Sequence, residues 1–475
     1  MDTLRIGGKE QFSIVRQALL QADFTESAVC ARIGCSFISD ARSRVRQMSE
    51  VMIENALDVY IRLFLDGTYL PVATVAGFLT QEVLEAFLTI DLLRTDPTAP
   101  RQCAATVMLY PTKGVYIASD RDSNPDSSPF ELPSDTVYPA LIKNTQRFLS
   151  QLPDVPCERY LEMCGGAGAA AIIAASRKAS VSISCDITPR STHFARFNGL
   201  LNGLENFTAL CGDLYAPIGD ETFDIIVAHP PYVPATGEGM IYKEGGDDGE
   251  SITRAIIAGL PKYLRPGGQF QCTCGGSDRE TGTFEERARE WLGPAADEFD
   301  ILFVTEGLVR GSQMKRWEEL RDRYKIIEFV LGSFLIQRKA TGRRPITLRR
   351  VSNETVTRES SESLLATAAV LHAFDAQEIL ALKPRIAEDL VFNVQHKWAD
   401  GAFTAIALHL TVRRPFPKEM TAEPWVIRFL EACDGTLTCA QVAEKLRKAE
   451  IMGDATPEAL ADTISTMILN GLLTI

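Results

Sequence analysis

The chain has 475 residues, 45% of them hydrophobic and 23% charged, and its formal net charge is −13. This composition excludes wholesale disorder, a collagen-like fibre and a small disulfide scaffold, and the length predicts about three domains. The negative charge argues against duplex DNA as the default partner, because no global positive field gathers phosphates.

Neither export nor membrane insertion is indicated. Residues Met1–Arg5 lack a basic segment followed by an apolar run, and no later stretch approaches about 18 uninterrupted apolar residues. We therefore expect a cytoplasmic protein without a membrane partner. The eleven cysteines include no C-x-x-C pair, and most have apolar neighbours. Buried thiols are the expectation, and no metal site is predicted.

Residues 1–120 are predicted to form a helical, winged-helix-like domain. Apolar residues recur there at helical spacing, as in the stripe Leu57, Ile61, Phe64 and Leu65. Two strand-like runs, Thr106–Tyr110 and Gly114–Ala118, are then joined by Pro111–Lys113 in the manner of a hairpin. A loop rich in Pro, Ser, Asn and Asp, Arg121–Phe130, marks the first domain boundary.

Residues 121–345 alternate apolar strand-like runs with helical stretches, which favours βαβ units and a Rossmann-like α/β fold with about seven strands. The last two strands, on either side of a helix at Gln313–Tyr324, are expected to close the sheet as an antiparallel pair. The seven predicted strands are Arg159–Met163, Val181–Asp186, Thr208–Cys211, Phe223–Ala228, Gly268–Cys274, Phe299–Thr305 and Lys325–Arg338.

Residues 346–475 are predicted to form a second helical, winged-helix-like domain. Three amphipathic helices contain Trp425, Val442 and Leu460, and an apolar tail follows. Such modules bind nucleic acid or other proteins; the acidity of the chain favours a protein contact, and a homodimer is left open. The basic run Gln337–Arg350 lies at the end of the last predicted strand and indicates either a solvated edge and linker or a phosphate or RNA contact.

The first motif with chemical content is a glycine-rich turn after a strand. The strand ends in Glu162, and the small residues Gly165, Gly166 and Gly168 let the backbone approach a ligand before a helix begins. Asp186 ends the next strand, where a carboxylate can accept hydrogen bonds from both ribose hydroxyls. A nucleoside-containing cofactor is therefore predicted.

The second motif is His229-Pro230-Pro231-Tyr232, directly after the strand Phe223–Ala228. The prolines end strand pairing and direct His229 and the carbonyl of Pro230 beyond the carboxyl end of the strand. A histidine acceptor, a backbone carbonyl and a tyrosine ring can together hold a flat nitrogen group.

These motifs resemble the class I S-adenosylmethionine-dependent methyltransferases, in the branch whose fourth strand ends in Asn/Asp-Pro-Pro-Tyr. That branch includes the glutamine N5-methyltransferases of release factors, other "methyltransferase small" domain proteins, and RNA and DNA amino-methyltransferases. The resemblance is good from Tyr160 to Cys274 and rests on Glu162–Gly168, Asp186, Cys211–Tyr215, His229–Tyr232, Glu244–Gly249 and Leu264–Gly268.

The resemblance implies S-adenosylmethionine as the cofactor. The turn of Cys164, Gly165, Gly166 and Gly168 would hold the methionine moiety, with Glu162 acting through its surroundings or a water. Asp186 would hold the ribose, and Ile187 would pack on the adenine. Asp213 and Leu214 would contact the adenine edge, and His229 would lie beside the cofactor. The resemblance also implies that His229, Pro230 and Tyr232 are the catalytic residues.

Two positions depart from the family pattern: Cys164 stands at the usual first glycine, and His229 at the usual Asn or Asp. A neutral imidazole offers one acceptor and can also take a proton. The first functional hypothesis is N-methylation of an amide or amine of a protein or small molecule. The alternatives are an RNA base N-methyltransferase, a small-molecule O-methyltransferase with His229 as base, a NAD-dependent oxidoreductase, and a non-catalytic scaffold.

Overall fold

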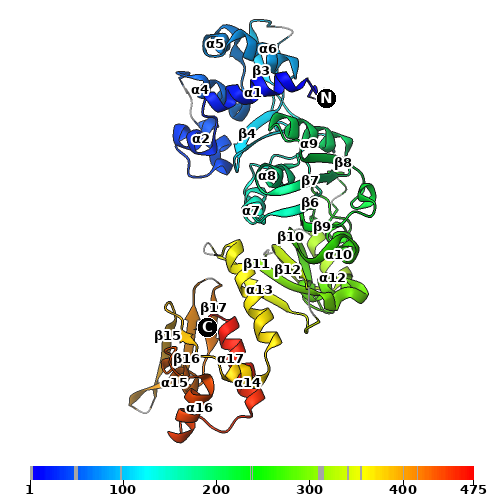
Figure 1. Cartoon of the computed structure of the whole chain (residues 1–475). Helices are drawn as coiled ribbons and strands as arrows, with labels where there is room; N and C mark the ends of the chain where they lie inside the picture. The colour runs from blue at the N-terminus through cyan, green and yellow to red at the C-terminus, as the bar shows by residue number, and fades with distance from the viewer. Residues whose placement is uncertain are drawn as a thin grey trace. The chain divides into compact units, whose positions relative to one another are not determined.

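The computed structural model describes residues 4–47, 52–96, 99–235, 237, 239–308, 315–339, 342–353, 356–399, 401–414 and 416–475 (Figure 1). The chain divides into two compact units. The first comprises residues 1–276 and 319–324, and the second comprises residues 277–318 and 325–475. Division into three domains at residues 120 and 345 stays a prediction; in the structure, residues before 120 share one hydrophobic core with the parallel sheet of the first unit.

The first unit begins with short helices, as the apolar spacing predicted. Leu57 is half-buried, whereas Ile61, Phe64 and Leu65 are fully buried, so the stripe faces the core. Thr25, Asn55 and Thr80 cap three of the helices through their side chains. The elements are α1 (Lys9–Gln21), α2 (Glu26–Ile33), α3 (Ala41–Gln47), α4 (Ala56–Tyr60), a π-helical turn (Ile61–Asp66), α5 (Val72–Phe78), α6 (Gln81–Thr89) and the small sheet β1 (Leu70–Pro71), β3 (Gln102–Ala105), β2 (Leu93–Thr95).

The predicted hairpin is present as β4 (Met108–Thr112) and β5 (Val115–Ser119), which pair antiparallel. Two asparagines of helix α9 (Pro189–Leu201 and its C-cap) bind the free edge of β5. Asn198 accepts from the Ala118 N–H and donates to the Ala118 carbonyl at 2.8 and 2.9 Å. Asn202 makes the same pair with Tyr116 at 2.9 and 2.7 Å. The hairpin is therefore attached to α9 rather than free.

Five parallel strands form the sheet of the first unit in the order β10-β9-β6-β7-β8. The chain passes to β7 on one side of β6 and to β9 on the other, so the strand order reverses at β6, where open α/β sheets bind ligands. Helices α7 (Lys143–Ser150), α8 (Ala169–Arg177), α9 and α10 (Ser251–Tyr263) accompany the sheet, whose strands are β6 (Cys157–Met163), β7 (Ala179–Asp186), β8 (Phe207–Cys211), β9 (Phe223–Ala228) and β10 (Leu264–Arg279).

The second unit contains the predicted antiparallel pair, β11 (Phe299–Leu308) and β12 (Ile326–Arg338). All seven predicted strands are thus present, and the α/β class is confirmed. An eighth strand, β13 (Thr347–Val351), pairs parallel with β11 and was not predicted. Of the predicted helix Gln313–Tyr324, the structure describes α12 (Lys315–Tyr324), and residues 313–314 lie outside the described part. Helices α11 (Phe284–Trp291) and α13 (Arg358–Ala373) complete this region.

The basic run Gln337–Arg350 is not a solvated linker, because four of its five arginines bind partners within the second unit. Arg338 pairs with Glu298 at 2.6 Å, and Arg343 pairs with the buried Asp300. Arg349 binds Asp278 at 2.6 Å and Glu285 at 2.5 Å. Arg350 donates to the carbonyl of Leu469 at 2.9 Å. These charges therefore stabilise the fold.

The C-terminal residues contain the three predicted helices, α15 (Pro424–Glu431), α16 (Cys439–Lys448) and α17 (Pro457–Leu469), around a small core. Thr438 caps α16 by accepting from the Gln441 N–H at 3.2 Å. An antiparallel sheet of β15 (Val391–Ala399), β16 (Ala402–Val412) and β17 (Lys418–Thr421) was not predicted. The remaining elements are α14 (Ala376–Leu380), β14 (Arg385–Ile386) and β18 (Leu473–Thr474).

No described helix is both long and apolar enough to cross a membrane. Six cysteines are buried, four are half-buried and Cys211 is exposed, and all eleven are free thiols. The expectation of buried thiols is therefore met at most positions.

Candidate active site

A pocket of about 870 Å³ opens at the carboxyl ends of β6, β7 and β9, within the first unit. This is the upper part of the range for small-molecule sites, so it leaves room for a cofactor and an acceptor group together. Every predicted site residue except Gly168 lines it: Glu162, Cys164, Gly165, Gly166, Asp186, Ile187, Asp213, Leu214, His229, Pro230 and Tyr232.

The glycine turn connects β6 to α8. Gly165 donates its N–H to the Cys185 carbonyl at 3.0 Å, and Gly168 donates to the Gly165 carbonyl at 2.8 Å. Gly168 has φ +77°, and a Cβ there would lie 2.9 Å from the Cβ of Ala195. A Cβ at Gly165 would lie 2.0 Å from the Ser184 hydroxyl oxygen. The small residues are therefore required both by backbone angle and by close packing.

Glu162 holds the turn from beneath. Its carboxylate accepts from the N–H groups of Ala170 and Ala171, in the first turn of α8, at 3.1 and 3.0 Å. Burial raises the pKa of this carboxyl to about 7, although the two N–H groups oppose the shift. Both oxygens are thus committed to the helix, so an effect of Glu162 on the methionine end would pass through the turn. That role stays a prediction.

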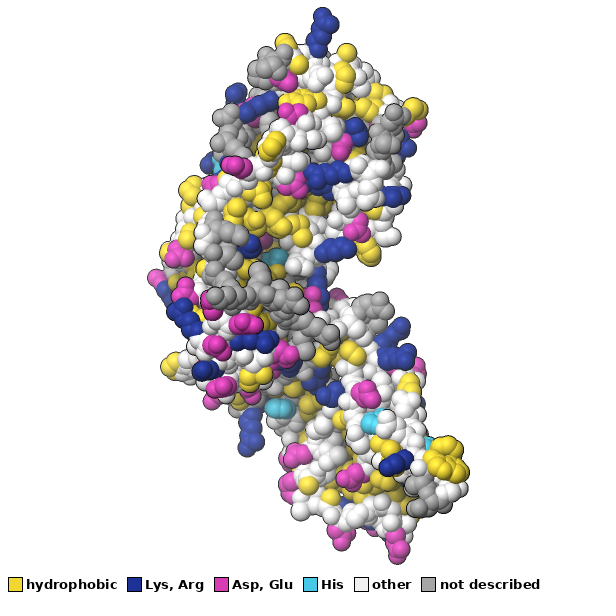
Figure 2. Space-filling view, turned by 180° about the vertical axis from the view of Figure 1, so that it is seen from behind, with side chains coloured by type: hydrophobic (Ala, Val, Ile, Leu, Met, Phe, Trp, Pro, Cys, Tyr) yellow, Lys and Arg dark blue, Asp and Glu magenta, His cyan; other side chains and the backbone are white. Residues whose placement is uncertain are grey.

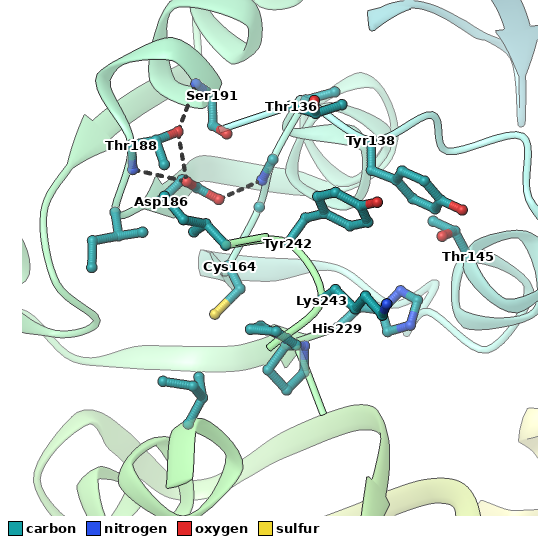
Figure 3. A pocket seen from close by; sticks show the side chains of 18 of the residues that line it. Thr136, Tyr138, Thr145, Cys164, Asp186, Thr188, Ser191, His229, Tyr242 and Lys243 are labelled. Carbon is teal, nitrogen blue, oxygen red and sulfur yellow. Dashed lines mark hydrogen bonds between the residues drawn. The ribbon is translucent and has the colours of Figure 1, made fainter. Parts of the chain in front are cut away.

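Cys164 occupies the left-handed region with φ +55°, the conformation that suits the glycine usual at this position. Its sulfur points into the pocket (Figure 3). Burial raises the pKa of the thiol well above its ordinary value, so the group stays an uncharged thiol at neutral pH. The first departure from the family pattern is therefore accommodated by the backbone.

Asp186 ends β7 and organises the next loop. One carboxylate oxygen accepts from the Gly166 N–H at 2.9 Å, and the other accepts from the Thr188 N–H at 3.0 Å. Thr188 in turn caps α9 by accepting from the Ser191 N–H at 3.0 Å (Figure 3). Ile187, beside this carboxylate, leaves 54% of its surface exposed. A carboxylate next to an exposed apolar side chain suits a ribose and its base.

Asp213 and Leu214 lie in the turn after β8. Gly212 donates its N–H to the Asp186 carbonyl at 2.9 Å, which keeps this turn beside the end of β7. Leu214 has φ +46°, and its carbonyl accepts a hydrogen bond from the Cys185 thiol at 3.2 Å. The two residues predicted at the adenine edge are therefore brought next to the predicted ribose residue.

His229, at the end of β9, lies near two aromatic rings. Its ring centre is 5.4 Å from that of Phe148, in α7, and 6.1 Å from that of Tyr232. Burial lowers the pKa of His229 to about 4, because an imidazolium would be poorly solvated there. The ring is therefore neutral at pH 7 and keeps one nitrogen as an acceptor. No described residue provides a hydrogen bond to it.

Tyr232 is positioned by residues that the sequence analysis did not identify. Asn144 donates from its side-chain amide to the Tyr232 hydroxyl at 3.3 Å. Gly275, in β10, makes room for the ring, since a Cβ there would lie 2.9 Å from it. Tyr138 and Tyr242 also line the pocket. Tyr242 lies two residues before the recognised Glu244–Gly249 segment, a signal that could have found it; Tyr138 and Asn144 lie in no motif.

The charge of the lining is negative. Five acidic side chains, those of Asp135, Glu162, Asp186, Asp213 and Glu244, line the pocket together with a single lysine, Lys243. Glu162, with its pKa raised to about 7, carries only part of a negative charge at neutral pH. Such a lining attracts a cationic ligand and repels a phosphate. S-adenosylmethionine carries a sulfonium cation, so the charge of the pocket fits this cofactor.

Comparison with known proteins places this site in a family. Residues 140–275 match the family model of the methyltransferase small domain. The ribosomal protein uL3 glutamine methyltransferase of Bradyrhizobium diazoefficiens is 32% identical over 160 residues, covering 31% of this chain and 50% of the relative. The chain therefore spans about half the length of that relative. The enzyme of the same name from Bordetella pertussis is 28% identical over 268 residues, covering 53% of this chain and 87% of the relative.

Among solved structures, the ribosomal protein L11 methylase of Lactobacillus delbrueckii aligns with 19% identity and a TM-score of 0.27, covering 42% of this chain and 79% of the other. The family-model match and the sequence relatives agree with the motifs gathered around the pocket. Residues 140–275 of this chain are a methyltransferase small domain, of the S-adenosylmethionine-dependent methyltransferases.

Proposed function

We propose that the protein is an S-adenosylmethionine-dependent methyltransferase that methylates an amide or amine nitrogen of a protein acceptor. The observation that carries this proposal is the neutral imidazole of His229, which shares one pocket with Asp186 and the glycine turn. It is a hydrogen-bond acceptor without a described partner, placed where the cofactor residues converge.

The cofactor, when bound, supplies a methyl group on a positively charged sulfur, which an acceptor lone pair attacks in line. The residues that would hold it are the glycine turn for the methionine moiety, Asp186 for the ribose, and Ile187, Asp213 and Leu214 for the adenine. The acidic lining and the exposed Ile187 side chain support this assignment.

The chain's own part in the reaction is to position the acceptor. His229 accepts a hydrogen bond from one N–H of the nitrogen to be methylated, and the Pro230 carbonyl accepts a hydrogen bond from the other, so the lone pair points away from both. Once the methyl group is attached, the nitrogen releases one proton to water. The Tyr232 ring stacks on the plane of the acceptor group. Positioning and removal of water provide most of the acceleration in such a transfer.

The charges disfavour the RNA alternative. Three arginines of the one basic run, Arg338, Arg343 and Arg349, form ion pairs with Glu298, Asp300, Asp278 and Glu285. Figure 2 shows Lys and Arg side chains intermixed with Asp and Glu over the visible face, rather than gathered into one basic area. A pocket with five acidic side chains in its lining would also repel a phosphate backbone.

The O-methyltransferase alternative needs His229 to remove a proton from a hydroxyl group. A base with a pKa of about 4 is too weak for efficient proton removal at neutral pH. An amide nitrogen is uncharged at neutral pH and needs no base before the transfer, so the lowered pKa of His229 favours an amide over a hydroxyl acceptor.

The relatives are named as methyltransferases of glutamine in ribosomal protein uL3 and in release factors. We extend to this chain a protein acceptor of that translational class, and with it a cytoplasmic location. We assign the choice of acceptor to the segments outside the matched domain, namely the residues before the sheet and those after β13.

The test is transfer of labelled methyl from S-adenosylmethionine into a cell extract that is then treated with protease or ribonuclease. We expect protease-sensitive label. Label that is lost only on ribonuclease treatment would overturn the protein acceptor in favour of RNA. Calorimetry with S-adenosylhomocysteine and with NAD tests the cofactor, and binding of NAD alone would contradict the proposal.

A further inference from the structure

Two tyrosines from distant parts of the chain stack over the pocket. The ring centres of Tyr138, in the loop before α7, and Tyr242, in the loop before α10, are 4.6 Å apart and their planes differ by 11°. Figure 3 shows the two rings side by side above His229. Both line the pocket, and 45% of the Tyr138 surface is exposed. The pair therefore lies at the mouth of the pocket.

The loop that carries Tyr242 is hydrogen-bonded both to the segment that carries Tyr138 and to the residue that follows Tyr232. Ile241 donates its N–H to the Ser134 carbonyl at 3.0 Å, which joins the loop to the segment that carries Tyr138. Val233, next to Tyr232, donates to the Lys243 carbonyl at 3.0 Å. The stacked pair is thus fixed relative to Tyr232, on the acceptor side of the pocket.

A buried ion pair between Asp120 and Arg190 fixes the residue that precedes Tyr138. Asp120, directly after β5, accepts from the guanidinium of Arg190 with a distance of 3.0 Å to Nε. The same carboxylate oxygen accepts from the Val137 N–H at 2.8 Å, and the Asp120 N–H donates to the Val137 carbonyl at 3.0 Å. The side chains are only 8% and 11% exposed.

Arg190 lies in the first turn of α9, the helix that Thr188 caps beside Asp186. Asp120 therefore connects the ribose side of the pocket to Val137, the residue preceding Tyr138. None of these contacts is needed to bind a nucleoside, since Asp120 and Arg190 do not line the pocket. Their effect on the pocket passes through the position of Tyr138.

We propose that Tyr138 and Tyr242 form an aromatic clamp that positions the polypeptide on either side of the acceptor residue, and that Asp120 and Arg190 are positioning residues for this clamp. This inference rests on the proposed function. Ring faces beside the exposed Ile241 offer an apolar contact to a peptide.

The kinetic test compares Tyr138→Ala with Tyr138→Phe in the full chain, using labelled S-adenosylmethionine and protein extract as the acceptor. We expect Tyr138→Ala to raise the apparent KM for extract protein about tenfold, with S-adenosylhomocysteine affinity within twofold of wild type. Tyr138→Phe keeps the stack and should stay near wild type. Equal losses for both variants, or a parallel loss of cofactor affinity, would overturn the clamp.

Tyr263→Ala is the matched control. Tyr263 belongs to another stacked tyrosine pair, with ring centres 4.2 Å apart, outside the pocket lining. Its loss should leave the apparent KM for extract protein unchanged. A rise equal to that of Tyr138→Ala would show that any lost stack has this effect, and would contradict a specific role.

The positioning residues are tested by Asp120→Asn and by the double variant Asp120→Asn/Tyr138→Ala. If Asp120 acts through Tyr138, the double variant is no worse in KM than Tyr138→Ala; additive losses would overturn this assignment. Should Asp120→Asn fail to fold, Arg190→Lys, which keeps the charge but not the fork geometry, takes its place in the same cycle.

Hydrogen exchange separates this inference from the proposed function. Tyr242→Ala and Asp120→Asn should each speed exchange in residues 133–142 about tenfold, because both free that segment. Unchanged exchange would refute the clamp. If wild type binds S-adenosylhomocysteine but methylates no extract protein, the proposed function fails, while the exchange result still decides whether the clamp exists.

Discussion

The ring centres of His229 and Tyr232 lie 6.1 Å apart with an interplanar angle of 24°. The hydrogen-bonding nitrogen of His229 and the ring face of Tyr232 can therefore contact the same bound group in the pocket. We expect His229→Ala and Tyr232→Ala each to lower methyl transfer by about 10²- to 10³-fold, the cost of removing one precisely placed polar group or ring. S-adenosylhomocysteine affinity, measured by calorimetry, should change little. His193→Ala, outside the pocket, is the control; wild-type rates in both site variants would disprove the assignment.

The pH dependence of transfer distinguishes an orienting histidine from a basic one. Because the pKa of His229 is lowered to about 4, the imidazole stays neutral from pH 8 down to about pH 5 and loses its acceptor only as the pH falls through 4. We expect a flat rate between pH 6 and 8 in a pH–rate profile. A fall near pH 6.5, the ordinary histidine value, would contradict the burial of the ring.

Glu162 should make the protein less stable as pH rises. Its pKa of about 7 in the folded state exceeds the unfolded value of 4.5, so the folded state binds more protons between these values. The free energy of unfolding should therefore fall from about pH 4.5 to 7 and then level off. Glu162→Gln should remove this slope and cost about 1–2 kcal/mol by leaving one helix N–H unpaired. Denaturant unfolding at pH 5 and pH 8 measures both effects; an unchanged slope would refute them.

Gly275 should control acceptor binding through Tyr232. A methyl group in Gly275→Ala would lie 2.9 Å from the ring and displace it. We expect the apparent KM for the protein acceptor to rise severalfold, with cofactor affinity unchanged. Gly77→Ala, in helix α5 with open space around the position, is the matched control and should have wild-type kinetics. Equal kinetics in the two variants would mean that the ring can move without consequence.

The basic run should contribute stability rather than nucleic-acid affinity. Arg349→Ala leaves Asp278 and Glu285 without their guanidinium partner and should cost about 3 kcal/mol of unfolding free energy. Transfer to protein by the wild type should change less than about threefold between 50 and 200 mM salt, whereas binding through many phosphates would fall by orders of magnitude. Steep salt dependence would restore the RNA alternative.

Much of the fold could be predicted because the signals for its strands and helices lie in short, continuous stretches of sequence. Strands such as Phe223–Ala228 are continuous apolar runs, as parallel strands buried on both faces require. Strand β13 was missed because Arg349 and Arg350 look solvated in the sequence; their partners lie far away along the chain. Strands β15 and β16 were missed because many of their side chains are exposed, including Trp398 and Phe403, so burial left no clear pattern.

The site divides in the same way. Glycine turn, Asp186 and His229 follow strands within single motifs, and the structure brings them to one pocket. Asn144 and Tyr138 contact the Tyr232 and Tyr242 rings through folding alone, with no spacing that could signal it. The hydrogen bonds from Glu162 to the first turn of α8 could not be predicted from the sequence either, because a carboxylate at the end of a strand can face a ligand or a helix.

The asparagine contacts to β5 impose an order on biosynthesis. The hairpin of residues 108–119 leaves the ribosome long before Asn198 and Asn202, which complete the hydrogen bonds of its open edge. The edge of β5 therefore stays unpaired until Asn198 and Asn202 have been translated. An exposed strand edge can pair with other chains, so we expect nascent chains stalled before residue 198 to be prone to aggregate.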